Sequence, residues 1–393
     1  MRVALVHDWL TGMRGGERVL DELAGLFPEA DLYTLFHVPG STSPRIEGLR
    51  IHASPLSRLP GAARHYRKLL PLYARAIERF RLVGYDLVLS SSHAVAKGVR
   101  VAPGIPHVCY CHTPMRYVWD QADAYLGRGL ARALASPLMR ALQRFDLRTS
   151  GPDRVQRFVA NSRTVAARIR RRYGREARVV YPPVAVDRIR PSGRPPEDFF
   201  LLVGGFVPYK REEIALEAFR RLGLRLVVVG DGPRRKRLRA TAPPGAEFPG
   251  RVPDAELFDL YARCRALVFP AEEDFGIAAV EAQAAGRPVI AFGRGGALES
   301  VIPPGAGSEA MTGLLFPEQT PDALADAVRA FARREGEFDP QAIRRNAMRF
   351  APAHFRAGIQ REIAAALAEP RQARAEAEAE GESAGAFPGS RVR

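Results

Sequence analysis

The sequence predicts an α/β protein of two Rossmann-like, doubly wound domains facing a cleft. Segments with the patterns of buried strands and amphipathic helices alternate along the chain twice, which is the order that builds a parallel sheet covered by helices. A proline-rich stretch at residues 181–198 separates the two series and fits neither a helix nor a central strand. With 393 residues and 46% hydrophobic content, the chain is long enough to bury two cores.

The first series begins with a strand at residues 2–7, a glycine-bearing loop at 12–16 and a helix at 17–27. Apolar residues in that helix recur at the spacing of one buried face. Further strands are predicted at these segments: 32–36, 86–90, 107–111 and 157–160.

The second series begins with a strand at residues 199–203, a helix from Arg211 and a strand at 224–229. It continues with a βαβ unit, in which a strand at 266–270 and a helix at 276–285, stopped by Gly286, lead to a strand at 288–292. Residues 342–367 are predicted to be helical with a break near Pro352, and the alanine- and glutamate-rich end is predicted to be disordered. The expected boundaries are a first domain at 1–182, a linker at 183–197, a second domain at 198–350, a terminal helix at 351–370 and a disordered tail at 371–393.

Two glutamates, Glu273 and Glu281, stand eight positions apart across the strand-to-helix junction of the βαβ unit. The backbone N–H groups of Phe275, Gly276 and Ile277 lie at the start of the helix, where unpaired donors receive a phosphate group. Carboxylates beside them can accept hydrogen bonds from sugar hydroxyls. The segment therefore indicates a nucleotide-sugar site, against the alternative of a solvated helix start that carries acidic residues.

A second loop, residues 204–211, joins a strand to a helix and ends with Lys210 and Arg211. A compact cation there can hold a diphosphate leaving group and stabilise the charge it gains. The alternative is an ordinary surface lysine near a helix start.

The predicted first domain offers a glycine pair, Gly15 and Gly16, after its first strand, and His112 at the carboxyl end of a later strand. An imidazole in that place can hydrogen-bond a sugar hydroxyl or an acceptor, and Tyr117 and Trp119 can pack against a pyranose ring. Against this, a lone histidine is more often structural, and two adjacent glycines are often only a tight turn.

Together these motifs resemble the family-four retaining glycosyltransferases, which have the GT-B fold. The resemblance is carried by five segments: 270–281, 204–211, 230–233, 111–119 and the glycine pair at 295–296. The resemblance covers residues 1–368 and is greatest to the mannosyltransferase-like branch that builds bacterial surface polysaccharides. It implies that Glu281 holds the ribose, that Glu273 holds the sugar ring, and that Lys210 with the amides at 275–277 holds the diphosphate. It also implies that Gly15 and Gly16 approach the donor phosphates, that the acceptor enters over the first domain near His112, and that the terminal helix crosses back to that domain.

One position departs from the family pattern. Members usually carry an arginine where this chain has Gly205, and Arg211 or Arg294 is the expected substitute for its phosphate contact. The alternative function is therefore a catalytically silent or non-transferase GT-B relative, such as a sugar-nucleotide epimerase or the partner of a transferase.

The formal net charge of +16 favours anionic partners, but the basic residues are spread through the chain and no nucleic-acid recognition motif is present, so nucleic acid is not expected. Three cysteines give neither a disulfide framework nor a zinc pattern, and the absence of an Asp-x-Asp pair predicts metal independence. No cofactor is expected; the nucleotide-sugar is a substrate, with GDP-mannose favoured by resemblance.

The sequence contains neither a membrane-spanning stretch nor a signal peptide, which predicts a cytoplasmic protein. Residues 62–82 mix apolar and basic side chains. They form either a surface that docks on the inner face of the membrane or two helices around Pro71 that cover the sheet. Membrane docking suits a polyprenyl-diphosphate-linked acceptor, the alternative being another glycan.

Overall fold

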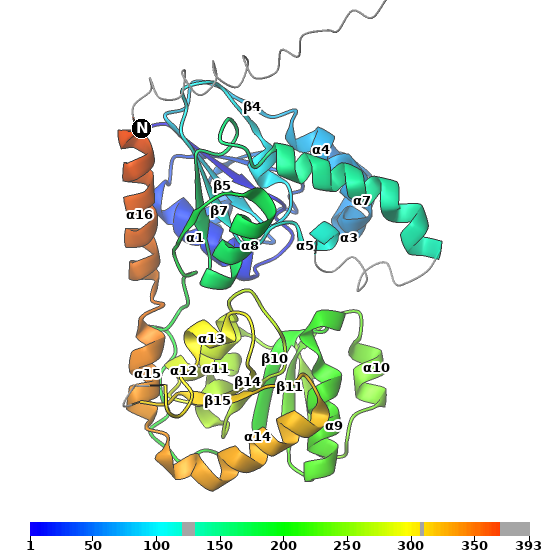
Figure 1. Ribbon diagram of the computed structural model, residues 1–393, viewed down its shortest axis with the longest axis vertical. Helices are drawn as coiled ribbons and strands as arrows, with labels where there is room; N and C mark the ends of the chain where they lie inside the picture. Colours follow the sequence, from blue (N-terminus) through cyan, green and yellow to red (C-terminus); the bar gives the residue numbers. More distant parts are fainter. Residues whose placement is uncertain (120–129, 307–309, 370–393) are drawn as a thin grey trace, which may run out of the picture. The chain divides into compact units, whose positions relative to one another are not determined.

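The structure is a computed structural model that describes residues 1–119, 130–306 and 310–369 (Figure 1). The chain divides into two compact units. Unit 1 contains Met1–Ala160, Val165–Val180 and the chain from Arg356, and unit 2 contains Asn161–Thr164 and Tyr181–Phe355. The predicted disordered tail, residues 371–393, lies outside the described residues.

Unit 1 is built on a parallel seven-stranded sheet of order β3-β2-β1-β5-β7-β8-β9. Its strands are β1 Val3–His7, β2 Asp31–Thr34, β3 Arg50–Ala53, β5 Leu87–Ser92, β7 His107–Cys111, β8 Arg157–Ala160 and β9 Ala177–Val179, and a separate small sheet pairs β4 Arg81–Leu82 with β6 Arg100–Val101. Its helices are α1 Gly15–Leu26, α2 Pro44–Glu47, α3 Ala62–His65, α4 Leu70–Ile77, α5 Arg116–Trp119, α7 Leu130–Arg148, α8 Arg163–Tyr173 and α16 Pro352–Ala368.

Unit 2 repeats the plan with a parallel six-stranded sheet of order β12-β11-β10-β13-β14-β15. Its strands are β10 Phe200–Gly205, β11 Leu226–Asp231, β12 Ala246–Gly250, β13 Leu267–Phe269, β14 Val289–Phe292 and β15 Gly313–Phe316. Its helices are α9 Glu212–Leu222, α10 Arg235–Ala240, α11 Asp254–Arg263, α12 Ile277–Ala284, α13 Ala297–Ser300, α14 Pro321–Arg334 and α15 Pro340–Met348.

Both sheets have the strand order of a Rossmann fold, and helices lie on both sides of the strands in each unit (Figure 1). Alternate residues of β10 show why helices cover both faces of the sheet in unit 2. Leu201 belongs to one hydrophobic core, while Phe200 and Leu202 belong to a second core on the opposite face of the sheet. Both faces are therefore buried, as the near-continuous apolar strands predict.

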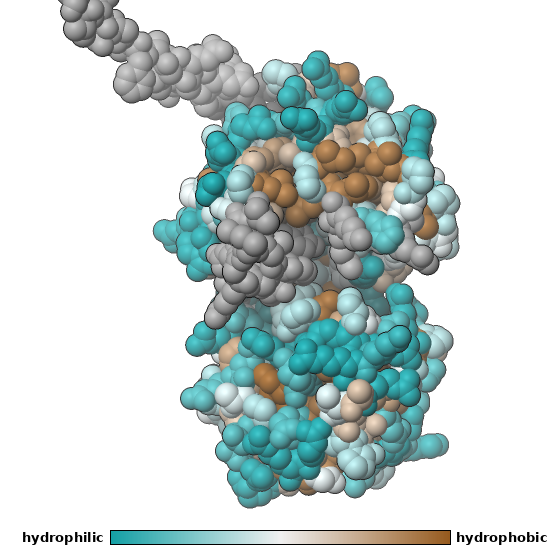
Figure 2. All heavy atoms as spheres, turned by 90° about the vertical axis from the view of Figure 1, so that its right-hand side faces the viewer, coloured by the Kyte–Doolittle hydropathy of each residue, from teal (hydrophilic) through white to brown (hydrophobic). Residues whose placement is uncertain are grey.

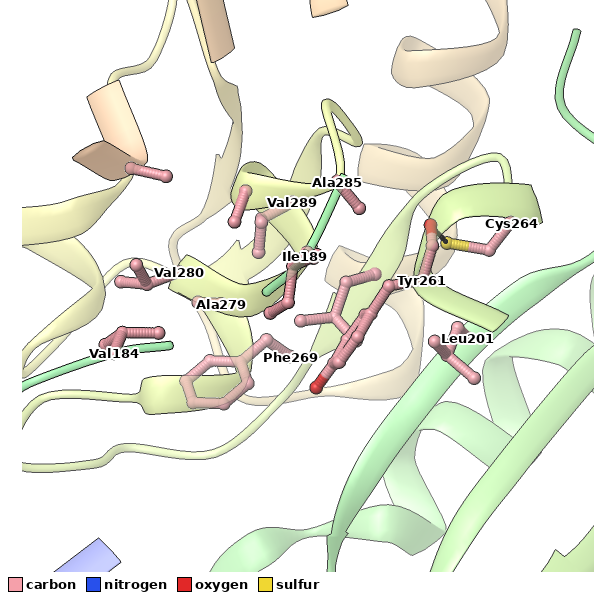
Figure 3. Packing of buried hydrophobic residues seen from close by; sticks show 14 of the residues in the cluster. Val184, Ile189, Leu201, Tyr261, Cys264, Phe269, Ala279, Val280, Ala285 and Val289 are labelled. Atoms are coloured by element: carbon pink, nitrogen blue, oxygen red, sulfur yellow. Dashed lines mark hydrogen bonds between the residues drawn. The ribbon is translucent and has the colours of Figure 1, made fainter. Parts of the chain in front are cut away.

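The proline-rich segment predicted as a linker, residues 183–197, is instead part of unit 2. Val184, Val186 and Ile189 are fully buried in its core. Figure 3 shows Val184 and Ile189 packed in the same cluster as Tyr261 and Ala279. The segment cannot join a helix or a sheet because of its prolines, but its apolar residues still gain free energy by burial.

Helix α16 returns to unit 1. Arg157 of β8 forms an ion pair of 3.0 Å with Glu362 of α16, and Arg356 forms an ion pair with Glu22 of α1. The break predicted near Pro352 is confirmed, since α15 ends at Met348 and α16 begins at Pro352.

The segment at residues 62–82 forms α3, α4 and β4 and packs mainly inward. Tyr66, Tyr73 and Ile77 are buried in the core of unit 1, whereas Leu72 is 43% exposed. Most apolar residues of the predicted membrane surface are thus used for packing against the sheet.

Candidate active site

The two loops singled out in the predicted second domain leave neighbouring strands of unit 2. Leu201 of β10 is paired with Leu267 of β13, and the strand order reverses between these two strands. The lysine loop follows β10, and the acidic loop that contains Glu273 follows β13. Ligands of open α/β sheets bind at the carboxyl ends of strands at such a switch point, so the topology places both loops where a ligand is expected.

Lys210 and Glu273 are in direct contact. The Nζ atom of Lys210 forms an ion pair with Oε1 of Glu273, and each side chain is 18% exposed. The structure therefore brings together the residue expected to hold phosphate and the residue expected to hold the sugar. Their contact holds both side chains in place at the carboxyl end of the sheet.

The glycine pair Gly295–Gly296 allows the acidic loop to take its position. A Cβ atom at Gly296 would lie 2.2 Å from the Cα of Phe275, and one at Gly295 would lie 2.3 Å from the carbonyl oxygen of Glu273. The Gly296 N–H donates to that same oxygen at 2.8 Å. Only glycine permits this approach, so the pair fixes the backbone that carries Glu273.

The start of α12 is formed by Gly276 and Ile277. Gly276 has a φ of 90°, a left-handed conformation that favours glycine. Phe275 is buried in the core beneath it. Glu281, one turn into the helix, is 4% exposed and accepts a hydrogen bond of 3.0 Å from the hydroxyl of Tyr261. Tyr261 orients the carboxylate, and no local sequence pattern points to this partner because it lies 20 residues away.

The position of Gly205 leaves room for a side chain. A Cβ atom there would lie 3.9 Å from its nearest neighbour, the carbonyl oxygen of Asp231. Of the proposed substitutes, Arg211 has a left-handed φ of 58° and lies 3.7 Å from Glu213, and Arg294 is exposed near the ring of Phe292. The structure does not bring either guanidinium onto Lys210 or Glu273.

A third cation, Arg234, was missed in the sequence because its loop reads as a turn. Its N–H donates to the carbonyl oxygen of Phe206 at 3.3 Å, so it lies beside the lysine loop. Its guanidinium lies 2.9 Å from Glu213 and 3.3 Å from Glu212. Burial raises the pKa of Glu212 to about 7.

Unit 1 contains a separate cluster of three histidines at the carboxyl ends of β1, β5 and β7: His7, His93 and His112. Their ring centroids are 5.9–6.4 Å apart. His112, which the sequence predicts as a site residue, is joined to His7 through the hydroxyl of Ser91. Gly16 packs against the same rings, since a Cβ atom there would lie 3.4 Å from Cε1 of His7. His112 and Gly16 are therefore neighbours, while Gly15 begins α1 beside them.

Asp8 fixes the loop that carries His93, and its role was also missed. Its carboxylate is fully buried and accepts hydrogen bonds of 2.7–2.9 Å from the backbone N–H groups of four consecutive residues, 93–96. The ring of His93 lies 3.2 Å from the same carboxylate. In sequence, Asp8 appears only as the polar end of a strand.

We predict that unit 1 loses stability in mild acid. Burial lowers the pKa of His7, His93 and His112 to about 3 and that of His107 to about 4. Between these values and 6.5 the unfolded chain binds protons that the folded unit does not, so stability falls as the pH falls through this range. Glu17 opposes the effect, because burial raises its pKa to about 7 and the folded unit binds its proton.

The stability lost through the four imidazoles exceeds the stability gained through the Glu17 carboxyl. Lowering the pH from 7 to 6 should therefore destabilise unit 1 by about 2 kcal/mol. Both tryptophans of the chain, Trp9 and Trp119, lie in unit 1, so urea unfolding followed by tryptophan fluorescence measures this unit. An unfolding midpoint that is unchanged or higher at pH 6 would contradict the assignment of neutral, buried histidines.

Within residues 1–119, 130–306 and 310–369, no group of three His, Cys, Asp or Glu side chains is arranged to hold a metal ion. In the same part of the chain, no helix combines the length and apolarity that crossing a bilayer requires. The three cysteines are buried and form no disulfide bond, and Cys109 and Cys111 pack in one core.

Both halves of the chain match known families. Residues 13–188 match the family described as Glycosyltransferase Family 4, and residues 197–334 match Glycosyl transferases group 1. The GDP-mannose-dependent alpha-mannosyltransferase of Mycolicibacterium smegmatis is 32% identical over 276 residues, which are 65% of this chain and 68% of that protein. The O-antigen chain mannosyltransferase C of Escherichia coli is 31% identical over 139 residues, which are 34% of this chain and only 36% of the relative's length.

Solved structures agree on the fold. The HepE protein of Anabaena in complex with UDP superposes with a TM-score of 0.68 at 16% identity, over 93% of this chain and 100% of that one. The sucrose-phosphate synthase of Thermosynechococcus elongatus gives 0.65 at 18% identity, with coverage of 93% and 100%. With the two parallel sheets, the matched families and the mycobacterial relative, the predicted GT-B fold is confirmed, and the chain belongs to the GT-B glycosyltransferase family.

Proposed function

We propose that this protein is a retaining glycosyltransferase that moves a hexose, with mannose from GDP-mannose favoured, onto a glycan or polyprenyl-diphosphate-linked acceptor in cell-surface polysaccharide biosynthesis. The observation that carries the proposal is the contact between Lys210 and Glu273 at the switch point of unit 2, beside the start of α12. It sets a cation for a diphosphate next to a carboxylate for sugar hydroxyls. A UDP complex of the HepE structure and the GDP-mannose dependence named for the mycobacterial relative support a nucleotide-sugar donor.

Each part of the donor is bound by residues of matching chemistry. Lys210 and the amides at Phe275, Gly276 and Ile277 bind the diphosphate and stabilise its charge as the sugar leaves. Glu281, oriented by Tyr261, accepts hydrogen bonds from the ribose. In this proposal no metal ion or cofactor takes part, and Arg211, Arg294 or Arg234 supplies the cation that is missing at Gly205.

Retention follows from attack of the acceptor on the face that the diphosphate leaves, with the leaving phosphate taking the acceptor proton. Glu273 binds the sugar ring and forms no bond to it. Capture of a glycosyl-enzyme adduct, for example by mass spectrometry of enzyme quenched during turnover, would overturn this route.

The roles of the two glutamates predict two different defects. Glu273→Ala should lower kcat by about 100-fold with little change in nucleotide Kd, because Glu273 acts on the sugar that transfers. Glu281→Ala should raise the nucleotide Kd about 10-fold to 100-fold, because charge-assisted hydrogen bonds to the ribose are lost. Glu272→Ala, which removes the carboxylate next to Glu273, is the matched control. Equal effects of the first two substitutions on kcat and Kd would refute the division.

One observation favours a second function, that of a catalytically silent GT-B relative. Gly205 stands where an arginine is expected, although the backbone leaves room for a side chain. Gly205→Arg separates the two functions: a transferase should keep or gain activity, whereas a silent relative should show none before or after the change.

We further propose that unit 1 contacts the inner face of the cytoplasmic membrane through exposed residues of α4 and the turn after it. Leu72, Arg75 and Arg79 are exposed there, and Figure 2 shows hydrophobic residues gathered on one face of unit 1. An apolar side chain flanked by arginines suits an anionic lipid surface.

Co-sedimentation with vesicles should increase when anionic lipid is added, and Arg75→Glu should reduce it. Arg329→Glu, at an exposed arginine of unit 2, is the control that should leave co-sedimentation unchanged. Equal co-sedimentation with and without anionic lipid would contradict the proposed membrane contact.

A further inference from the structure

The histidine cluster of unit 1 contains a continuous hydrogen-bonded chain that links His7 to His112. The Oγ atom of Ser91 lies 3.1 Å from Nδ1 of His7 and 2.8 Å from Nε2 of His112. His7 and Ser91 are 0% and 1% exposed. His112 is half-buried, and its Nδ1 atom has no hydrogen-bond partner among the described residues.

The hydroxyl of Ser91 carries one proton, which couples the two rings. If Ser91 donates to one imidazole, the other must donate to Ser91. Burial keeps both rings neutral, so each carries a single N–H. Among the described residues the two rings are the only hydrogen-bond partners of the Ser91 hydroxyl, so it donates to one ring and accepts from the other. The chain therefore has two states: either His112 presents Nδ1–H to its surroundings, or it presents the Nδ1 lone pair.

The lengths of the two bonds favour the first state. Hydrogen bonds donated by a hydroxyl are typically shorter than those donated by N–H, with modes near ~2.75 Å and ~2.95 Å. The 2.8 Å bond to His112 fits donation by the Ser91 hydroxyl, and the 3.1 Å bond fits donation by Nδ1–H of His7.

The far side of His7 gives independent support. Its Nε2 atom is buried without a hydrogen-bond partner and faces Gly16, where a Cβ atom would lie 3.8 Å away. Gly16 is in the first turn of α1, a helix of 12 residues, whose free N–H groups make this end positive. The positive end of the helix stabilises a bare nitrogen lone pair there and disfavours an N–H. His7 thus carries its proton on Nδ1.

We infer that His7 and Ser91 are positioning residues that fix His112 in the Nδ1–H form, so that His112 donates a hydrogen bond to a substrate oxygen and does not act as a general base. The substrate in this inference rests on the proposed function. The direction of the hydrogen bonds does not, because it follows from Ser91, Gly16 and the unpartnered nitrogen of His7.

The groups that surround the chain are consistent with this direction. Asp8 lies next to His7 in sequence, but its carboxylate is occupied by the N–H groups of residues 93–96. His93 contacts Asp8 and is itself neutral through burial. The charge of Asp8 favours a cationic His7, but burial outweighs it and keeps the ring neutral.

Long-range ¹H–¹⁵N spectra of the full-length protein labelled at histidine test the inference directly, since the chain has only eight histidines. We expect the signals of His7 and His112 to show a protonated Nδ1 and a bare Nε2. A protonated Nε2 on His112 would overturn the inference. The spectrum requires no turnover, so it stands even if the protein transfers no sugar, and an inactive protein with the expected spectrum would refute the proposed function alone.

Ser91→Ala provides the kinetic test, and Ser90→Ala is a matched control. Ser90 lies on the same strand, is equally buried and bonds an imidazole at 2.8 Å, but that ring belongs to His107. Ser91→Ala should lower kcat about tenfold relative to Ser90→Ala while leaving nucleotide Kd unchanged, with a mixture of His112 tautomers in the spectrum. Equal kcat for the two variants, or an unchanged His112 spectrum in Ser91→Ala, would refute the positioning role.

Discussion

Replacing Lys210 with alanine should lower kcat by about 100-fold to 1000-fold, the largest effect on activity that we expect. The diphosphate gains negative charge as the sugar departs, and a fixed cation at that oxygen stabilises the transition state more than the ground state. Lys210 is held at its place by Glu273, so its charge is oriented before the donor binds. The loss should therefore appear in kcat more than in the Kd of the nucleotide-sugar.

Lys236→Ala is the matched control, since Lys236 is an exposed lysine on α10 of the same unit. Because Lys210 and the helix start neutralise the diphosphate in our proposal, EDTA should leave the wild-type rate unchanged. Loss of activity in EDTA that magnesium restores, or a Lys210→Ala rate like that of Lys236→Ala, would contradict this role.

Replacing Lys97 with methionine should destabilise unit 1 by about 3–5 kcal/mol. The ammonium group of Lys97 is buried and donates to Oδ1 of Asp146 at 2.7 Å, to the Asp146 carbonyl oxygen at 3.0 Å and to Thr149 at 3.1 Å. The other oxygen of Asp146 accepts from Trp119 and Tyr173. Removing the cation leaves a buried carboxylate without its ion pair, which costs more than the packing lost.

Urea unfolding followed by the fluorescence of Trp9 and Trp119 measures this loss in unit 1 alone. The double variant Lys97→Met/Asp146→Asn is the control, and it should recover part of the stability because no unpaired charge remains. A single variant that is as stable as the double variant would show that the ion pair does not stabilise the fold.

The elements of the fold follow from local patterns and were largely predictable. The strands β7 and β8 have the predicted boundaries. The strand before Glu273 and the helix after it are each shorter than predicted by one residue at both ends. Such segments carry their own signal, because buried parallel strands are continuous apolar runs and helices repeat apolar residues on one face. The proline-rich segment differed because local pattern shows only that it is neither helix nor strand, and its burial depends on the tertiary structure.

The site was predictable only in part, for the same reason. Lys210 and Glu273 were chosen separately, and the fold brings them into contact across 63 residues. Partners with no local signal were missed: Tyr261 beneath Glu281, Ser91 between two histidines, and Asp8 beneath the loop at His93. The sequence does not distinguish a hydroxyl or carboxylate that faces solvent at the end of a strand from one that is buried in a hydrogen-bonded network.

Calorimetric titration of the wild-type protein and Glu281→Ala with GDP, UDP and ADP, and with their common sugar conjugates, tests the central claim most directly. We predict selective binding of one nucleotide, with GDP favoured, and a Kd that rises about 10-fold to 100-fold in Glu281→Ala. That result would place the donor at α12 of unit 2 and identify its base. Failure of every nucleotide to bind the wild type, or equal binding by Glu281→Ala, would contradict the site and favour a silent relative in which Gly205 has removed donor binding.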